Sequence, residues 1–423
     1  NQFFTSSRGI SNNPQVTKLL KANKVHLLGF LSQPKIDHSI LVGWGYKPTA
    51  AKARHVAKQK NLPYWALEDG FISWLNHPTQ SKPSQRLSYI LDKQGMYYDA
   101  STPSDLDTCI ESIRCKTSNF NETRIKYLKQ QLIKLKVSKY NQARAGFPAW
   151  LEQCKKNEIP LILLVDQTFN DASIEYSGGG KHSFKAMFEW GITKLKENSA
   201  ANLILKIHPD VILGSKKGYL YELLLEAKAS PNLHELTKRI HLLSEDVCPT
   251  DLIALSNKVA TVSSQLGFEA LWQNKEVTCF AWPFYAGRGL TEDLATKPIG
   301  YSRIQGTLSE LMHGALILYP TYLHPDTQNE CEIEDVLNYL QAHFLIRNLK
   351  CNQLVIPNVS LWKRSFIPEF IANSSADITY RKTFKTEDTE LVWGMKAPLS
   401  DNKYWRMEDG FIRSVGLGAD LRR

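Results

Sequence analysis

The sequence has few cysteines and no long apolar run. Its seven cysteines are odd in number and scattered between Cys109 and Cys351, and no two of them form a Cys-x-x-Cys pair. Such a pattern is typical of reduced thiols in a cytoplasm and argues against a cysteine zinc site. The longest apolar stretches, residues 161–165 and 315–319, are far shorter than the roughly 18 residues of a membrane-spanning helix. We therefore expect no such helix.

Other familiar signals are also missing. The opening residues lack the pattern of a signal peptide, so we expect a cytoplasmic protein. The glycine run at residues 178–180 fails as a phosphate-binding P-loop, because that motif needs glycine where Glu175 stands and serine or threonine where His182 stands. No nucleic-acid-binding module or dense block of lysine and arginine is present, so we expect no nucleic-acid partner.

What the sequence does have is a globular composition with surplus positive charge. Its 423 residues are 43% hydrophobic, and 52 Lys+Arg against 42 Asp+Glu leave a net charge of +10. A chain of this length is too long for one compact domain and predicts two or three. The surplus charge favours acidic or phosphorylated partners, or an anionic membrane surface, without choosing among them.

Short apolar runs alternate with longer amphipathic stretches, which is the rhythm of β-α units around a mostly parallel sheet. The expected strands are residues 25–30, 39–44, 64–67, 87–92, 161–165, 202–207, 240–243, 259–262 and 277–281. The expected helices are residues 49–60, 122–136, 183–197, 220–229, 250–255 and 265–273, the second of them a connector. The pattern predicts an α/β fold of two Rossmann-like lobes, residues 1–150 and 151–330, with a cleft between them. In such sheets ligands bind beyond the carboxyl ends of the strands.

One stretch near the start of the chain recurs near its end. Residues 41–48, Leu-Val-Gly-Trp-Gly-Tyr-Lys-Pro, are followed by Glu68-Asp-Gly-Phe-Ile72. Residues 391–398, Leu-Val-Trp-Gly-Met-Lys-Ala-Pro, are followed by Glu408-Asp-Gly-Phe-Ile412. Chance is a poor explanation for five identical residues in matching context. We expect residues 331–423 to hold a helical return or linker and the beginning of a second, incomplete module.

The first candidate loop carries two adjacent carboxylates. Glu68 and Asp69 follow the expected strand at residues 64–67. Neighbouring side chains of an extended segment point to opposite faces, so one carboxylate can enter the cleft while the other holds the loop. Gly70 permits the sharp departure that such a loop needs. A helix cap with a turn is the alternative, and the recurrence at Glu408 counts against it.

The second candidate loop follows the most apolar strand. Asp166 stands at the end of that strand, where it can be structural, and Asp171 lies in the middle of the loop. Asp171 is therefore better placed to reach a substrate as a nucleophile or general base. An Asx-turn or helix cap is the alternative for Asp171.

Two further loops have residues suited to a phosphate group. Lys206 and His208 alternate with an apolar residue, so they share one face of a strand, although a His-Pro pair is usually structural. Ser263 and Ser264 stand where an expected strand ends and a helix begins, so hydroxyls, free backbone N–H groups and the helix dipole converge on one anion site. Gly267 allows close approach there. Plain N-capping by one serine is the alternative.

Taken in order, these motifs resemble those of bacterial glycosyltransferases that use CMP-linked acid sugars, and most closely the KpsC-type retaining β-Kdo transferases of capsule biosynthesis. The likeness spans about residues 40 to 330. It rests on Trp44-Gly-Tyr-Lys-Pro48, Glu68-Asp-Gly-Phe-Ile72, Gly95-Met-Tyr-Tyr-Asp99, Ser138-Lys-Tyr-Asn141, Asp166-Gln-Thr168 with Asp171-Ala-Ser173, Lys206-Ile-His-Pro-Asp210, Ser263-Ser-Gln-Leu-Gly-Phe-Glu-Ala270 and Pro283-Phe-Tyr-Ala-Gly287 with Gly289-Leu-Thr291.

The family carries two such modules in tandem, which fits the second copy from Leu391. That copy reads Arg413-Ser-Val-Gly-Leu-Gly418 where the first reads Ser73-Trp-Leu-Asn-His77, so we assign the complete module to the N-terminal type. The resemblance implies a GT-B-like fold and transfer of Kdo from CMP-β-Kdo to a β-Kdo oligosaccharide on a phosphatidylglycerol-type lipid. It also implies peripheral association with the inner face of the inner membrane, beside capsule assembly and export proteins.

The same resemblance, joined to double displacement as in retaining glycosidases, gives the candidate residues their roles. Asp171 would be the nucleophile, with Asp166 in reserve, and Glu68 would transfer a proton or stabilise the adduct; Asp69 and His208 complete the catalytic set. The donor-binding candidates are Gln167, Lys206, His208, Ser263, Ser264, Gln265, Gly267 and Glu269, the last of them for the ribose. No metal-binding Asp-x-Asp motif stands in a suitable loop, so we expect neither a metal nor another cofactor.

Two alternatives stay open at this point. One is an inverting CMP-sialic acid transferase, in which Asp69 or Glu68 acts as general base without a covalent intermediate. The other is a catalytically silent module that binds a glycan or lipid, since a fold alone never proves activity. Four strand-end loops that suit one reaction count against a silent module.

Overall fold

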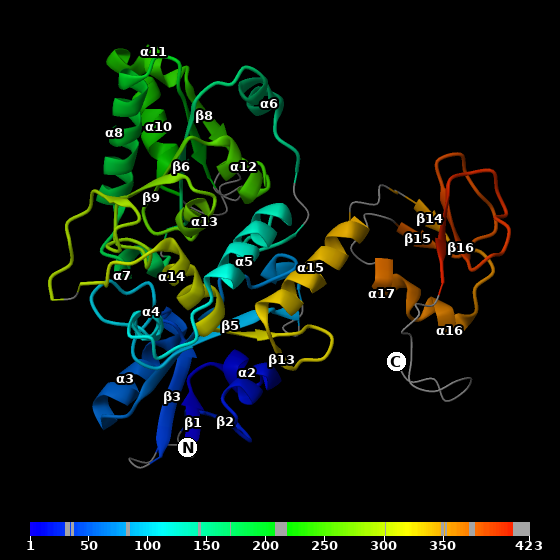
Figure 1. Cartoon of the computed structure of the whole chain (residues 1–423), viewed down its shortest axis with the longest axis horizontal. Coiled ribbons are helices and arrows are strands. Elements are labelled where there is room, and N and C mark those ends of the chain that lie inside the picture. The colour runs from blue at the N-terminus through cyan, green and yellow to red at the C-terminus, as the bar shows by residue number, and fades with distance from the viewer. Residues whose placement is uncertain are drawn as a thin grey trace. The chain divides into compact units, whose positions relative to one another are not determined.

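The structure is a computed structural model, which describes residues 1–29, 34, 38–81, 85–142, 145–169, 171–207, 218–300, 302–347, 351, 353–371 and 377–408. The chain divides into two units, Asn1–Leu337 and Asn338–Arg423. Figure 1 labels their helices and strands along the chain. No helix of the described ranges is long and apolar enough to cross a membrane.

The first unit contains a sheet of six parallel strands, in the order β11-β10-β9-β6-β7-β8. Its strands are β6 (Leu161–Val165), β7 (Asn202–Lys206), β8 (Ile240–Leu243), β9 (Lys258–Thr261), β10 (Glu276–Cys279) and β11 (Glu292–Asp293). The chain starts in the middle of this sheet and winds first to one edge and then to the other, as in a Rossmann fold. The direction of winding reverses between β6 and β9, which is where such sheets bind ligands.

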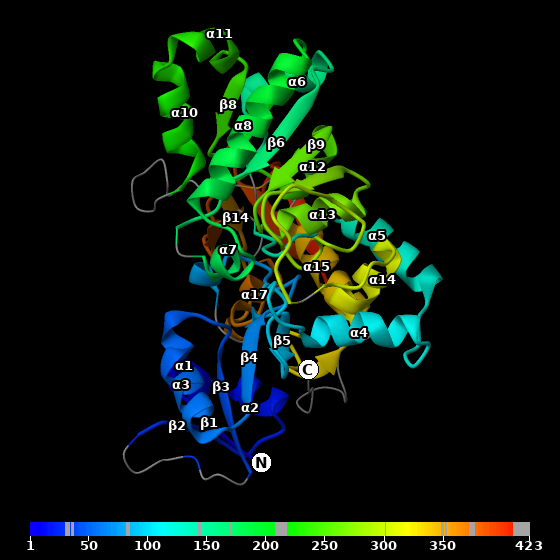
Figure 2. The ribbon, with the colours of Figure 1, turned by 90° about the vertical axis from the view of Figure 1, so that its left-hand side faces the viewer.

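Helices cover this sheet because its central strand is apolar on both faces. All five residues of β6 are buried. Ile162 and Leu164 pack against Phe184 and Met187 of α8, while Leu163 points to the opposite face. Figure 2 shows α8 and α10 beside the strands of this sheet. The helix α6 (Ala149–Lys156) precedes the first strand. The helices between later strands are α7 (Ala172–Tyr176), α8 (Lys181–Glu197), α10 (Leu220–Ala229), α11 (His234–Thr237), α12 (Pro249–Leu255) and α13 (Leu266–Trp272).

A second, seven-stranded sheet in the same unit has the order β13-β12-β5-β4-β3-β1-β2. Its strands are β1 (Gln2–Thr5), β2 (Val25–Leu27), β3 (Ser39–Trp44), β4 (Tyr64–Asp69), β5 (Ser88–Asp92), β12 (Pro320–Leu323) and β13 (Glu330–Cys331). The run from β2 to β4 is parallel, and the rest is antiparallel. The helices of this part are α1 (Arg8–Ser11), α2 (Pro14–Leu19), α3 (Ala51–Lys60), α4 (Asp105–Arg114), α5 (Glu122–Lys134) and α14 (Leu308–His313).

The second unit repeats the beginning of the first. Its sheet has four parallel strands in the order β15-β14-β16-β17, and its first two strands are joined through two short helices. The strands β2-β1-β3-β4 of the first unit are arranged in the same order, and α1 and α2 join β1 to β2. The elements are β14 (Gln353–Val355), α16 (Leu361–Arg364), α17 (Ile367–Ile371), β15 (Asp377–Thr379), β16 (Thr389–Trp393) and β17 (Tyr404–Met407), preceded by α15 (Ile333–Arg347), which runs across the boundary between the units.

The predicted α/β fold with parallel sheets is confirmed. Predicted strands and helices lie within a few residues of observed elements. The elements that were not predicted include the short ones at residues 2–19, the helices α4, α6, α14 and α15, and the return strands. The chain departs from the predicted ranges in one respect: β12 and β13 pair back to the first sheet through β5, although the sequence pattern assigns residues up to 330 to the second lobe. Antiparallel return strands are short and carry no β-α rhythm, which explains why the pattern does not show them.

Candidate active site

A cavity of about 780 Å³ opens among loops that follow strands of both sheets of the first unit. The loop after β3 contributes Lys47, and the end of β4 contributes Glu68 and Asp69. The loops after β6 and β9 contribute Asp171 and Ser263, among others. The cavity therefore brings together carboxylates from both sheets, at the carboxyl ends of parallel strands. It reaches the reversal point between β6 and β9, as the winding of the sheet requires.

Glu68 lines the cavity near the end of β4 and is held there by its neighbours. The residue is only 6% exposed. Its Oε1 accepts hydrogen bonds from Lys47 Nζ at 3.3 Å and from the backbone N–H of Asp69 at 3.1 Å. Gly45, at φ +44°, allows this approach, because a Cβ there would lie 3.1 Å from Glu68 Oε2. A buried carboxylate with one cationic partner can exchange a proton with a substrate.

Asp69 has a different environment from Glu68. Arg86 Nε lies 3.0 Å from Asp69 Oδ1, and the guanidinium lies 4.6 to 4.8 Å from the ring centroids of Trp44, Trp74 and Tyr89. Aromatic faces and a carboxylate together stabilise a desolvated guanidinium. Asp69 is therefore tied to a fixed counter-ion, which suits a positioning role better than proton transfer.

Asp171 combines a helix cap with a side-chain oxygen that faces the cavity. It is the N-cap of α7, and its Oδ1 accepts from the backbone N–H of Ser173 at 3.0 Å. Its Oδ2 accepts a long hydrogen bond from Gln167 Nε2 at 3.4 Å. The capping alternative and the catalytic one are thus compatible, because they use different oxygens of one exposed carboxylate.

Gln167 and Ser263 bridge the reversal point of the second sheet. The backbone N–H of Ser263 donates to Gln167 Oε1 at 3.0 Å, and Gln167 Nε2 donates to Ser263 Oγ, also at 3.0 Å. Ser173 Oγ lies 3.1 Å from Ser263 Oγ. This small network joins the loop after β6 to the loop after β9 and holds Asp171 beside them.

Asp166 also lines the cavity, but its oxygens are used inside the protein. They accept from the backbone N–H groups of Gln167, Tyr219 and Leu220 at 3.0 to 3.2 Å, which fixes the start of α10. Burial raises the pKa of Asp166 to about 6 despite these hydrogen bonds. An engaged and partly protonated carboxyl is a poorer nucleophile than Asp171.

The loop after β9 does not offer the free N–H groups that its sequence predicts. The N–H groups of Ser263, Ser264, Leu266 and Gly267 all donate inside the protein. Gly267 instead makes room for Tyr285, whose hydroxyl donates to the carbonyl of Ser264 at 2.6 Å. The side chains at this strand end therefore reach the cavity, while most of the helix N-terminus is already satisfied.

Gln265 and Glu269 lie between the two sheets of the unit. Gln265 Nε2 donates to the carbonyl of Phe71 at 2.7 Å and to Glu269 Oε1 at 3.1 Å. Glu269, only 2% exposed, also accepts from Ser138 Oγ at 2.9 Å. Glu269 is absent from the cavity lining, so these contacts correct the predicted ribose-binding role: the residue anchors residues 138–141 to α13.

Lys206, predicted to bind phosphate, does not line the cavity. Lys206 Nζ donates to the carbonyls of Ile207 and Glu245 at 3.3 and 3.0 Å, and it is absent from the lining. The hydrogen bonds of Lys206 are made inside the protein because β7 ends beside the loop after β8. His208 lies outside the described residues.

The candidate residues predicted from the sequence leave out several that line the cavity, among them Lys47, Tyr97 and Lys139. Tyr97 is surrounded by Lys139, Glu68, Asp171 and Asp69, and burial raises its pKa well above the ordinary value, so it stays a neutral hydroxyl. All three belong to motifs that carry the family resemblance. A single sequence marks such positions as part of a motif but not as lining, because their approach depends on how the sheets pack.

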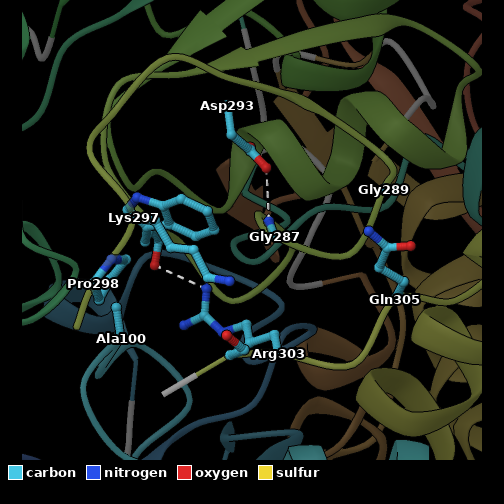
Figure 3. A pocket seen from close by; sticks show the side chains of 10 residues that line it. Ala100, Gly287, Gly289, Asp293, Lys297, Pro298, Arg303 and Gln305 are labelled. Carbon is cyan, nitrogen blue, oxygen red and sulfur yellow. Dashed lines mark hydrogen bonds between the residues drawn. The ribbon is translucent and has the colours of Figure 1, made fainter. Parts of the chain in front are cut away.

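A smaller cavity of about 280 Å³ lies beside the segment that carries Pro283 and Phe284 to the larger one (Figure 3). Arg303 Nη1 donates to the carbonyl of Trp282 at 3.0 Å, and the N–H of Gly287 donates to Asp293 Oδ2 at 2.8 Å. Gly287 has φ +74°, and a Cβ there would meet the Trp282 ring. These contacts fix one wall of the larger cavity.

Comparisons with known proteins agree with this architecture. The family model "Capsule polysaccharide biosynthesis protein" matches residues 39–145 and 115–322. The capsule polysaccharide modification protein LipA of Neisseria meningitidis serogroup A is 33% identical over 439 aligned residues, which cover 99% of this chain and 59% of LipA. The lipopolysaccharide-processing protein LpsZ of Rhizobium meliloti is 31% identical over 70% of this chain and 62% of its own length. The chain thus spans about three fifths of these curated relatives.

Solved structures give the same assignment. The β-Kdo 2,4 transferase of Thermosulfurimonas dismutans KpsC is 33% identical, covers 80% of this chain and 97% of its own, and superposes with a TM-score of 0.64. The β-Kdo 2,7 transferase of the same KpsC, at 24% identity and a TM-score of 0.56, shares the fold. The chain has the GT-B-like arrangement of these neighbours. It belongs to the capsule polysaccharide biosynthesis protein family and is of the KpsC type.

Proposed function

We propose that this chain is a retaining β-Kdo transferase, which moves Kdo from CMP-β-Kdo to a β-Kdo-terminated, lipid-linked oligosaccharide. One observation carries the proposal: Glu68, at the end of β4, and Asp171, in the loop after β6, line one cavity that reaches the reversal point of the six-stranded sheet. The similarity to a β-Kdo 2,4 transferase supports the sugar and the reaction class.

The proposed reaction has two displacements. Asp171 Oδ2 attacks the anomeric carbon of Kdo, the bond to the phosphate oxygen breaks, and CMP leaves with that electron pair. An acceptor hydroxyl then attacks the same carbon, its proton passes to Glu68, and the bond to Asp171 breaks. Ser173 keeps the carboxylate oriented through Oδ1. Two inversions give retention of configuration.

We propose that CMP is held by side chains around Gln167 and Ser263 and that no metal ion is required. Ser173, Ser263 and Ser264 line the cavity, and their hydroxyls can donate hydrogen bonds to a phosphate group. Treatment with EDTA should leave the rate unchanged, and restoration by Mg²⁺ after a loss would contradict this part. Association with the inner face of the inner membrane, through the lipid of the acceptor, belongs to the same proposal.

The decisive experiment is incubation of the chain with CMP-Kdo and a synthetic β-Kdo acceptor, followed by NMR of the product. We expect a β-linked product and, in the absence of acceptor, a Kdo adduct on Asp171 by mass spectrometry. An α-linked product would instead support the inverting alternative. If the chain neither transfers Kdo nor hydrolyses CMP-Kdo under any condition, the result would support a binding module.

Two variants assign the carboxylates. Asp171→Asn should abolish adduct formation, because an amide cannot act as this nucleophile. Asp166→Asn should retain adduct formation at a lower rate, since Asp166 orders the start of α10. An adduct on Asp166, or on any residue besides Asp171, would overturn the assignment.

A further inference from the structure

The cavity contains one lysine that the proposed reaction does not yet use. Lys139 lines the wall between the two sheets and is half-buried. Among the described residues, its ammonium has no ion-pair partner within 4.0 Å, whereas Lys47 in the same lining is paired with Glu68. The ammonium of Lys139 lies 5.7 Å from the centroid of the Tyr140 ring. The positive charge of Lys139 is thus available to a ligand.

The backbone around Lys139 is fixed from both sheets. Its carbonyl accepts from the N–H groups of Ser73 and Trp74 at 3.0 and 3.2 Å. On the same side, Asn141 Nδ2 donates to the carbonyl of Trp74 at 2.9 Å, and on the other side Ser138 Oγ donates to Glu269 Oε1 of α13 at 2.9 Å. A long side chain on such a rigid base loses little further freedom when it binds, which favours a recognition role.

The charge of Lys139 persists at neutral pH. Burial works against the charged form, but the neighbouring tyrosine oxygens and the carboxylates of Asp69 and Glu68 outweigh it and raise the pKa of Lys139 well above its ordinary value. Of the two carboxylates, Glu68 already accepts from Lys47 and Asp69 is paired with Arg86. A free anion that enters the cavity therefore meets a cation that internal partners have not neutralised.

We propose that Lys139 is the residue that recognises the carboxylate of the acid sugar. This inference rests on the proposed function. In a 2-keto acid sugar the carboxylate is attached to the anomeric carbon itself, so it lies one bond from the reacting centre. Lys139 lines the same cavity as the proton-transfer candidate Glu68 and the nucleophile candidate Asp171, so its ammonium can bind a carboxylate at that centre. An ammonium–carboxylate contact in a partly desolvated site discriminates strongly against a neutral sugar.

The carboxylate can belong to the donor or to the terminal sugar of the acceptor, and kinetics separate the two. Lys139→Met removes the charge at similar length. We expect it to raise the KM for CMP-Kdo in acceptor-free hydrolysis about tenfold or more if the donor is bound, or the KM for the acceptor by that factor if the acceptor is bound. Lys139→Arg should recover most of the affinity, because it keeps the charge.

The control variant is Lys134→Met, at the exposed end of α5, which should change neither constant. Unchanged KM values for both substrates in Lys139→Met, within about twofold, would overturn the proposal. If Lys139→Met does not fold, the wild-type chain supplies the test. Its acceptor-free hydrolysis should be inhibited at least about tenfold more strongly by methyl β-Kdo than by the corresponding carboxamide, or its transfer should discriminate likewise between the two as acceptors.

Absence of any discrimination by the wild-type chain in both assays would also overturn the role of Lys139. These outcomes differ from failure of the proposed function. In that case the wild-type chain would neither hydrolyse CMP-Kdo nor transfer Kdo. The KM measurements therefore apply only after activity has been shown.

Discussion

The parallel strands β2-β1-β3-β4 of the first unit and the four-stranded sheet of the second share one topology but differ in burial. The backbone is the same in detail: the N–H of Gly45 donates to the carbonyl of Leu67 at 2.7 Å, and the N–H of Gly394 donates to that of Met407 at 2.8 Å. Both glycines have positive φ. The repeated sequence therefore forms the same turn after β3 and β16, and the same hydrogen bond from that turn to the next strand.

The carboxylates that follow these strands have different surroundings. Glu68 is 6% exposed and paired with Lys47, whereas Glu408 is exposed. The strand β4 has β3 on one side and β5 on the other, while β17 pairs only with β16 among the described residues. The local motif thus specifies where the carboxylate stands, and neighbouring elements turn that position into a site.

The largest difference that we predict between the two copies is catalytic. Glu68→Gln should lower kcat for Kdo transfer by about 10²–10⁴-fold, because the amide cannot accept the acceptor proton. Glu408→Gln should change kcat by less than about twofold, as expected for an exposed surface carboxylate. Initial rates with CMP-Kdo and a β-Kdo acceptor measure both. A comparable loss in Glu408→Gln would show that the second copy takes part in catalysis.

A smaller difference is expected in stability. Gly45→Ala forces a left-handed conformation on alanine and places its Cβ against the Tyr98 hydroxyl and Glu68. We expect about 2–4 kcal/mol of destabilisation of the first unit. Gly394→Ala, at φ +64°, meets only the exposed end of Glu408, so about 1–2 kcal/mol is expected for the second unit.

Hydrogen exchange in β3 and β16 along a urea series measures the two effects separately. Equal losses in both strands would contradict the view that burial distinguishes the copies. A larger loss of stability for Gly394→Ala than for Gly45→Ala would show that the second copy is the more tightly packed one.

The smallest predicted effect concerns pH, for which one carboxyl in each unit, Asp166 and Asp388, should contribute to stability with opposite signs. Burial raises the pKa of Asp166 to about 6, so the folded first unit binds more protons than the unfolded chain between about pH 4 and 6. This carboxyl therefore contributes less to stability as pH rises through that window. The backbone N–H of Lys385, with help from Arg381, lowers the pKa of Asp388, so the contribution of Asp388 is lost as pH falls.

Hydrogen-exchange protection factors for β6 and β16, measured from pH 4 to 7, test these signs. In β6, the protection factor of wild type relative to that of Asp166→Asn should fall as pH rises. In β16, the protection factor of wild type relative to that of Asp388→Asn should increase as pH rises. Parallel trends in the two strands would show that one of the assigned causes is wrong.

Much of the fold follows from local patterns in the sequence. The buried run at residues 161–165 has the apolar residues of a strand covered on both faces, and it is the centre of the six-stranded sheet. The repeat at Leu391 predicts a second start of the module, and among the described residues the four-stranded sheet of the second unit has the strand order of β2-β1-β3-β4. Its last identical residues, 409–412, lie outside them.

The candidate site is predicted only in part. Glu68, Asp171, Gln167 and Ser263 line one cavity, as expected from strand ends that meet at a reversal point. Glu269 is turned toward residues 138–141, and Lys206 toward backbone carbonyls. Spacing along the chain does not distinguish these cases, because the same strand-end position can face a cavity or a neighbouring loop.

The sequence by itself determined the α/β class, the repeat and the loops that hold reactive side chains, because strand and helix periodicity and turn residues act over short distances. Tertiary structure alone decided the partners of each charge. Arg86 forms an ion pair with Asp69, and Lys47 forms one with Glu68. Lys139 lines the cavity, where we propose that it binds the carboxylate of a ligand. Ion pairs and desolvation depend on which distant segments pack together, and that arrangement is a property of the whole first unit rather than of any motif within it.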